Sequence, residues 1–269
     1  MSALLIYKLC ITMLAVLGLS FVAEKISARL AGLLSGYPIG TAIILHFYGL
    51  EYGAQFAADA AIFNLCGLLA SQCFAYSYYR ASQRIRSLFL VTVLALAGYL
   101  LPAFIVSQTN PSRPTARAIA IIATTLFCVL LRGNRVKQMS GARTWSARLI
   151  AGRLVLTATL VLVVTEFADM VGPGWAGVFS AFPVALYPLV LLLHREYGPE
   201  TAQSILGNFP YGLWSGSAYA LTVSLAYPLY GVVWGTLLGF ANATAVLAFM
   251  GTKPLLLYLK SHRQKVPET

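Results

Sequence analysis

Charged residues are scarce in this chain: they make up 10% of its 269 residues, against 59% hydrophobic residues. A soluble domain carries about 25% charged and roughly 45–50% apolar residues. Apolar segments of ~20 residues are long enough to cross a bilayer, and here they fill nearly the whole length. No room is left for a soluble catalytic domain, so the sequence indicates one integral membrane domain.

Sequence motifs for common enzyme chemistry are also missing. The chain has no Ser/His/Asp order, no Cys/His cluster, no phosphate-binding glycine loop and no His-Glu-x-x-His. Its four cysteines lie in apolar segments without a Cys-x-x-Cys pair, so we interpret them as reduced packing residues. We therefore expect no catalytic residue, no metal and no cofactor. An intramembrane enzyme that assembles Asp59, His46 and Glu24 in space is the alternative.

The formal net charge of +11 is explained better by membrane topology than by nucleic-acid binding. The basic residues lie at the ends of apolar segments and in loops, and they are not interleaved with aromatics along one helix face. With the N-terminus outside, fifteen of them fall on the inner side and only Arg113 and Arg117 on the outer side. This bias predicts an outside N-terminus, a cytoplasmic C-terminus and a cytoplasmic connecting loop at 132–148. Anchoring of this basic loop to phospholipid headgroups is an alternative that is compatible with that position.

The predicted fold is an all-α polytopic membrane protein of about nine transmembrane helices. Apolar runs bounded by charge, Gly or Pro place these helices near 3–23, 30–50, 54–79, 86–107, 114–132, 148–170, 175–194, 201–226 and 229–258.

The two halves of the chain repeat each other. Ala31-Gly-Leu-Leu-Ser-Gly-Tyr-Pro38 returns 145 residues later as Ala176-Gly-Val-Phe-Ser-Ala-Phe-Pro183, and fifteen positions between 8 and 71 are identical at this offset. Because an odd number of spans separates the copies, the second is inverted. The expected units are a four-helix repeat at 1–107, a linker helix and basic loop at 108–147, an inverted four-helix repeat at 148–258, and a cytoplasmic tail at 259–269.

The Ser-x-x-Pro unit in each copy is the first candidate for a substrate site. Pro38 and Pro183 each remove a backbone donor, so both helices should kink or open near the middle of the bilayer. Transporters with inverted repeats place their substrates where such broken helices meet. Ser35 and Ser180 then offer hydroxyl groups to a solute, or they only bond to carbonyls freed by the kink. The alternative is a packing kink with small residues.

Charged side chains inside spans are candidates for gates. Lys8 and Asp169 are predicted near the outer surface, and Glu24 and Arg153 near the inner surface. Opposite charges then face each other at both mouths, which predicts two alternating ion pairs; Glu166 is an alternative to Asp169. The competing interpretation is that the basic side chains reach out to the lipid interface.

Two weaker sets of residues complete the candidates. Polar side chains in the third and eighth spans either line a pathway or bond between helices; they are Asp59, Asn64, Gln72, Gln203, Ser204 and Asn208. Gly231, Gly235 and Gly239 form one face of the last span, where another helix approaches closely, either from this chain or from a second subunit of a homodimer. We interpret His46 and His194 as hydrogen-bonded interfacial residues, and the Glu-Tyr-Gly sequences at 51–53 and 196–198 as structural turns.

The first half resembles the GlpM family of small bacterial inner-membrane proteins. The resemblance rests on a basic residue early in the first span, the Ala-Gly-x-x-Ser-x-x-Pro segment and the Glu-x-Gly turn, within 8–79; the stretch 153–226 resembles the family independently. It implies two fused, inverted GlpM-like units, a bacterial inner-membrane location, and a link with exopolysaccharide production. The four-span unit duplicated in opposite orientation is also similar in layout to the drug/metabolite transporter superfamily.

We therefore expect a secondary transporter that works by alternating access. Lys8 and Arg153 favour a small anionic or phosphate-bearing solute. The alternatives are a flippase for lipid-linked or polyprenyl phosphates, and an intramembrane accessory protein or enzyme of exopolysaccharide synthesis.

Overall fold

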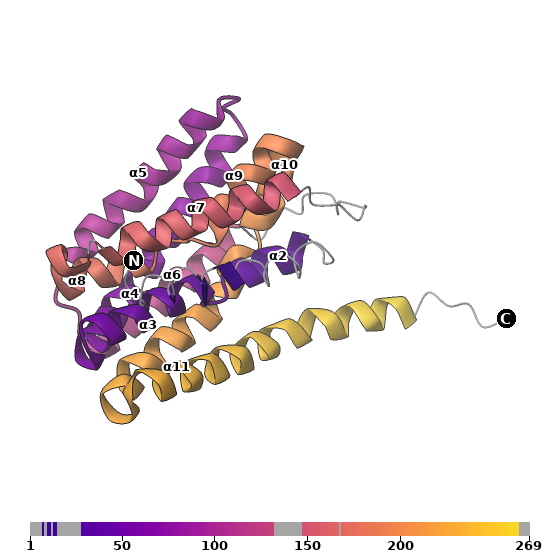
Figure 1. The fold of residues 1–269 in the computed structure, drawn as a ribbon. Coiled ribbons are helices and arrows are strands. Elements are labelled where there is room, and N and C mark those ends of the chain that lie inside the picture. Colours follow the sequence, from indigo (N-terminus) through magenta and orange to yellow (C-terminus); the bar gives the residue numbers. More distant parts are fainter. Residues whose placement is uncertain are drawn as a thin grey trace.

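The chain folds into a bundle of helices (Figure 1). The computed structural model describes Tyr7, Cys10, Ile11, Met13, Leu14 and residues 28–131, 147–166 and 168–263, with backbone alone at 28–30, 147–149, 168–170 and 251–263. Every regular element in these residues is helical, so the predicted all-α class is confirmed for this part of the chain.

The helices follow one another with short connections. In the described residues they are α2 (Ala28–Ser35), α3 (Ile39–Glu51), α4 (Ala54–Ser82), α5 (Leu88–Ser107), α6 (Arg113–Leu130), α7 (Ala147–Glu166), α8 (Ala168–Ser180), α9 (Leu186–Tyr197), α10 (Pro199–Leu206) and α11 (Phe209–Arg263).

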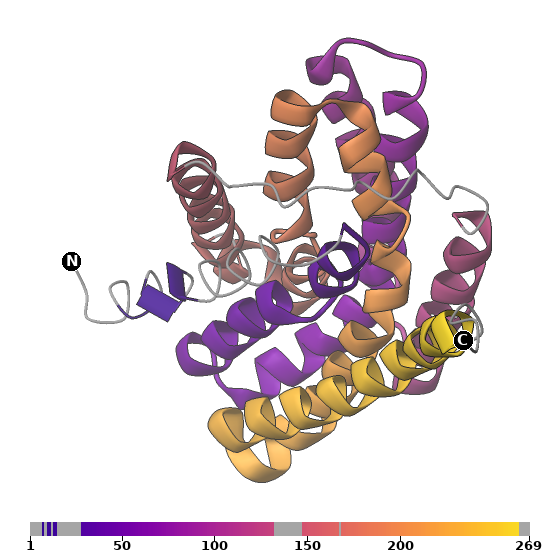
Figure 2. The ribbon, with the colours of Figure 1, turned by 90° about the vertical axis from the view of Figure 1, so that its right-hand side faces the viewer.

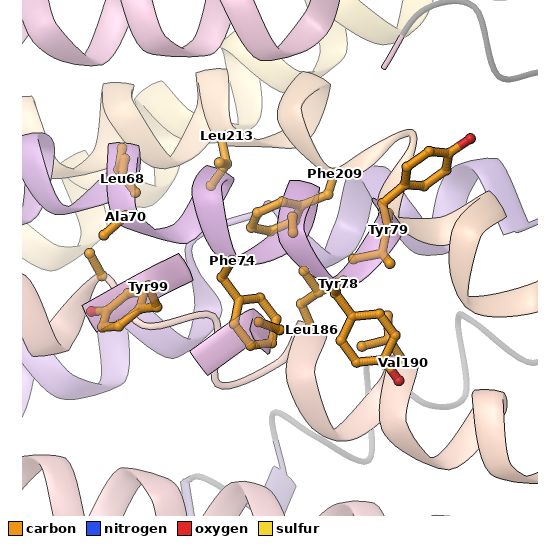
Figure 3. Close-up of a cluster of buried hydrophobic side chains, with 14 of the residues drawn as sticks. Leu68, Ala70, Phe74, Tyr78, Tyr79, Tyr99, Leu186, Val190, Phe209 and Leu213 are labelled. Atoms are coloured by element: carbon orange, nitrogen blue, oxygen red, sulfur yellow. The ribbon is translucent and has the colours of Figure 1, made fainter. Parts of the chain in front are cut away.

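Helix α4 is the centre of the bundle. Its 29 residues span about 44 Å at ~1.5 Å per residue, and it packs against α3, α5, α6, α8, α10 and α11. Phe74 and Tyr78 lie in one buried cluster with Leu186 and Val190 of α9 (Figure 3). Burial of large aromatic side chains on several faces explains how a helix of such low amphipathicity is held in place.

The outer face of the bundle is apolar. On α5 the buried residues Val91, Ala95, Tyr99 and Ala103 recur every four positions and form one helical face. The opposite face exposes large hydrophobic side chains, as do the described parts of α6 and the second half of α11. An apolar exterior of this extent is typical of a surface that contacts lipid.

Five helices in the described residues are long and apolar enough to cross a membrane. They run over Ala31–Glu51, which joins α2 and α3 across their break, Ala54–Ser82, Leu88–Ser107, Arg113–Leu130, and Phe209–Met250, which contains the turn at Gly231. The sequence predicted nine spans. The region of the predicted seventh span is divided into α8 and α9, of 13 and 12 residues, so neither half is long enough by itself to cross ~30 Å of hydrocarbon.

Two turns lie inside the helices α8 and α11. The chain reverses at Gly172 (φ 71°) inside α8 and at Gly231 (φ 77°) inside α11; Figures 1 and 2 show α11 folding back on itself. The turn at Gly172 falls between the predicted spans 148–170 and 175–194, and the turn at Gly231 falls inside the predicted span 229–258. The last helix continues to Arg263, beyond the expected start of the tail at 259.

The sequence interpretation missed a third helix break, between Leu206 and Phe209. Pro210 has no N–H to donate to the carbonyl of Leu206, so a continuous helix cannot pass this point without losing a bond. The chain instead closes α10 with hydrogen bonds from Gly207 N to Gln203 O and from Asn208 N to Ile205 O, both 3.0 Å. The predicted helix 201–226 is therefore divided into α10 and the start of α11.

Candidate functional site

The helices break at both Ser-x-x-Pro units, as predicted, and the two breaks share a pattern of backbone hydrogen bonds. Helix α2 ends at Ser35 and α3 begins at Ile39; α8 ends at Ser180 and α9 begins at Leu186. Four hydrogen bonds around Pro38 recur around Pro183 at the offset of 145. They are Gly36 N to Leu33 O, Tyr37 N to Leu34 O, Ile39 N to Tyr37 O and Ala42 N to Pro38 O, matched by Ala181 N to Val178 O, Phe182 N to Phe179 O, Val184 N to Phe182 O and Tyr187 N to Pro183 O.

The two breaks meet inside the bundle. Thr41 donates its hydroxyl to the carbonyl of Ser180 over 3.2 Å, and a cavity of about 30 Å³ lies between the two turns. Its lining includes Ser35, Pro38 and Pro183 among the predicted residues. Ten of the fifteen lining residues form five pairs that are 145 positions apart: Gly36 with Ala181, Tyr37 with Phe182, Pro38 with Pro183, Gly40 with Ala185, and Leu68 with Leu213.

Glycines bring the two halves into close contact on either side of this cavity. A Cβ atom added to Gly32 would lie 2.7 Å from Cβ of Asn208, and one added to Gly177 would lie 2.6 Å from Cβ of Phe63. At the offset of 145, Gly177 corresponds to Gly32 and Asn208 corresponds to Phe63. The two contacts therefore join equivalent positions, each linking one half to the other, with the roles of the halves exchanged.

A second pair of crossings repeats this reciprocity. An added Cβ on Gly212 would lie 2.9 Å from Cα of Gly36, and one on Gly67 would lie 2.8 Å from Cβ of Ala181. Each broken helix therefore packs against a helix of the other half, α2 against α10 and α11, and α8 against α4.

The two predicted serines are engaged with the protein itself. Ser35 donates to Ala31 O and Ser180 donates to Gly177 O, both over 2.7 Å. These bonds correspond to the alternative in which each hydroxyl satisfies a carbonyl of the preceding turn. Ser35 lines the cavity, whereas Ser180 is fully buried beside it.

The structure separates the two predicted asparagines. Asn64 of α4 is fully buried and donates to the Ser180 hydroxyl over 2.8 Å, and its Oδ1 accepts no hydrogen bond in the described part of the chain. Asn208 donates to Ser204 O of its own helix over 2.9 Å and does not line the cavity. Only Asn64 thus contacts a broken helix through its polar group.

The predicted gates lie largely outside the described residues. Nothing is described at Lys8 and Glu24, and only backbone at Asp169. Arg153 of α7 is 2% exposed, so its side chain lies within the protein and does not reach out to the lipid interface. Helix α7 packs against α3, α8 and α9, the helices that form both breaks.

The remaining predicted features have structural roles. His46 Nδ1 lies 3.0 Å from Thr236 Oγ1, and His194 Nδ1 lies 3.0 Å from the Tyr78 hydroxyl, so both histidines are hydrogen-bonded. Gly53 and Gly198 of the Glu-Tyr-Gly turns have φ of 93° and 86°, a region that favours glycine.

The glycine face of the last span is covered by the same chain. An added Cβ on Gly239 would lie 2.7 Å from the Tyr219 ring, and one on Gly235 would lie 3.2 Å from Tyr227 N. Gly231 forms the turn between these two helical segments. At Gly235 and Gly239 the close approach that the spacing predicted is made within the chain.

The sequence interpretation missed the side chains that hold α8 from the first half. Tyr99 donates to Val178 O over 2.6 Å, Tyr48 to Ala176 O over 3.3 Å, Thr41 to Ser180 O, and Ser71 to Ala181 O. A hydroxyl on a helical face gives no sign of its distant carbonyl partner, so no sequence signal identifies them.

The described residues contain no group of three or more His, Cys, Asp or Glu that could hold a metal ion. Comparison of the chain with protein-family models, with curated proteins and with solved structures found no match. The resemblance to the GlpM family therefore stays a prediction, and the function has to be argued from the geometry of the two breaks.

Proposed function

We propose that this chain is a secondary transporter that works by alternating access and carries a small anionic solute. The observation that supports this proposal best is the cavity between the two helix breaks, because paired positions of both halves line it. Transporters built from inverted repeats bind their substrates near the bilayer midplane, between discontinuous helices.

The proposal includes nine spans in two inverted repeats, in a bacterial inner membrane. The first span contains Tyr7, which packs edge-on against Phe47 at 5.6 Å between ring centroids. The others are α2 with α3, α4, α5, α6, α7, α8 with α9, α10 with the first half of α11, and the second half of α11. Helix α6 is then the odd span that inverts the second repeat.

Backbone N–H groups at the cavity favour an anion. Helices α3 and α9 both begin there, and the N–H groups of Gly40, Thr41 and Ala185 donate no hydrogen bond in the described part of the chain. The N-terminal end of a helix carries a partial positive charge and binds anions through such groups. Arg153, buried on the neighbouring α7, adds a full positive charge within the bundle.

The solute must enter after the broken helices have moved apart. A cavity of about 30 Å³ has room for a water molecule, whereas pockets for organic ligands measure roughly 300–1,000 Å³. The breaks provide short helical segments that can tilt separately from their neighbours, so the conformation described here corresponds to a closed step of the cycle.

Uptake into proteoliposomes tests the proposal. The purified chain would be reconstituted and offered inorganic phosphate, a dicarboxylate and a sugar phosphate, with choline as a cationic control and a fluorescent phospholipid to detect lipid translocation. Replacement of Arg153 by Gln should reduce uptake of the transported anion by about 10- to 100-fold, the value of a hydrogen bond to a charged group.

The Arg153→Lys variant is the matched control, because it keeps the charge and should retain part of the uptake. Rates would be normalised to the amount of folded protein in the vesicles. Equal uptake by the Gln variant and the parent would contradict the anion site. Lipid translocation without uptake of any anion would favour a flippase instead.

A further inference from the structure

The two helix breaks differ in how their carbonyl groups are satisfied. At the second break, Thr41 donates to Ser180 O over 3.2 Å, and Ser71 donates to Ala181 O. Both donors belong to the first half of the chain. The carbonyls at the end of α8 are therefore hydrogen-bonded although the helix stops there.

The first break lacks the corresponding donors. The positions 145 residues after Thr41 and Ser71 are Leu186 and Gly216, and neither side chain can donate. Accordingly, the carbonyls of Ser35 and Gly36 accept no hydrogen bond from any residue that the structure describes. A Cβ atom on Gly216 would lie 3.3 Å from Gly36 O. A serine at this position, as at Ser71 in the other half, would therefore have its hydroxyl close to this oxygen.

These two oxygens lie at the cavity. Ser35, Gly36 and Gly216 all line it, and Ser35 and Gly36 are buried. Buried carbonyls without a partner are rare in proteins and call for a ligand or water. They also lie at the C-terminal end of α2, where the helix dipole adds a partial negative charge.

We propose that the carbonyl oxygens of Ser35 and Gly36 bind a monovalent metal cation, and that this cation is Na⁺. Unwound carbonyls at half-helix C-terminal ends are ligands of Na⁺ in transporters.

Size and charge both select this class of ligand. The cavity of about 30 Å³ accepts one dehydrated ion and excludes an organic solute. No carboxylate is among the lining residues, and carboxylates are the usual protein ligands of divalent cations. Coupling of Na⁺ binding to anion transport rests on the proposed function, whereas the binding itself does not.

Direct binding of radiolabelled Na⁺ to the purified full-length chain tests the site without any solute. The diagnostic variant is Leu186→Thr, which supplies the missing donor at the position equivalent to Thr41. Its control is Leu186→Val, which has nearly the same shape as Thr and loses the same packing but adds no donor. A second variant, Gly216→Ser, supplies the donor equivalent to Ser71.

We expect saturable Na⁺ binding in the parent and in Leu186→Val, competed by excess unlabelled Na⁺ and not by choline. Affinity should fall at least tenfold in Leu186→Thr and in Gly216→Ser. Absence of saturable binding in the parent would overturn the proposal, as would equal affinities in the Thr and Val variants. This assay measures binding and not transport. A chain that binds Na⁺ as expected but carries no anion would therefore contradict the proposed function and leave the Na⁺ site standing.

Discussion

The close helix crossing at Gly177 makes a quantitative prediction for the Gly177→Ala variant. The added methyl group would lie 2.6 Å from Cβ of Phe63 and even closer to the carbonyl oxygen of Ala60. Carbon atoms make van der Waals contact at about 3.5–4.0 Å, so α8 and α4 must separate by roughly 1 Å. Because backbone atoms are involved, rotation of a side chain cannot relieve the overlap.

The expected magnitude combines two opposing effects. Overpacking costs about 1–3 kcal/mol, and separation of these helices also stretches the hydrogen bonds from Ser71 and Asn64 to the end of α8. Replacement of Gly by Ala in a helix returns about 1 kcal/mol. We therefore expect Gly177→Ala to lower the free energy of unfolding by about 2 kcal/mol.

Gly174→Ala is the matched control, on the same helix and next to the same residue. Its methyl group would lie 3.5 Å from the Phe63 ring, an ordinary contact, so this variant should be as stable as the parent or slightly more stable. Unfolding in detergent, followed by tryptophan fluorescence, measures both variants. If the two variants have the same free energy of unfolding, the helices do not cross as closely as the structure shows.

Three further outcomes are expected. Gly53→Ala should destabilise the protein by about 1–3 kcal/mol, because its φ of 93° with ψ of 159° is a region open essentially to glycine alone, and Gly198→Ala should do the same in thermal unfolding. Reporter fusions at residue 140 and at the C-terminus should both report cytoplasm, and a periplasmic signal at 140 would exclude the inverted topology. Exchange of the charges of Lys8 and Asp169 together should recover part of the transport lost in each single variant, with a coupling of ~0.5–3 kcal/mol; strictly additive losses would favour side chains that reach to the interface.

The sequence predicted the features of the fold that depend on local chemistry. Proline cannot donate a backbone hydrogen bond, so the breaks at Pro38 and Pro183 followed from residue type and position. The break before Phe209 had the same signal in Pro210, but the residues around it read as one apolar run. The turn at Gly172 falls where the sequence placed a connection, whereas the turn at Gly231 depends on a backbone angle that an apolar run does not reveal.

Partners across the bundle were beyond the reach of the sequence. The offset of 145 identified Gly32 and Gly67 as repeated positions, yet it did not show that each faces the opposite half. The hydroxyls of Thr41 and Ser71 were overlooked because a satisfied donor and an unsatisfied one look alike in a sequence. The asymmetry between the two breaks is visible only when the acceptors are known.

The exchange of broken helices between the halves has a consequence for the origin of such a chain. In the proposed inverted arrangement, each half leaves its α2 or α8 segment in a groove that belongs to the other half. Two separate copies of a four-span ancestor, inserted in opposite directions, would bury the same grooves against each other. In that arrangement, a gene that joined these copies would need one additional helix to reverse the second, and α6 would be this helix. Separately expressed segments on either side of residues 132–146 should accordingly assemble with each other, while neither should be stable by itself.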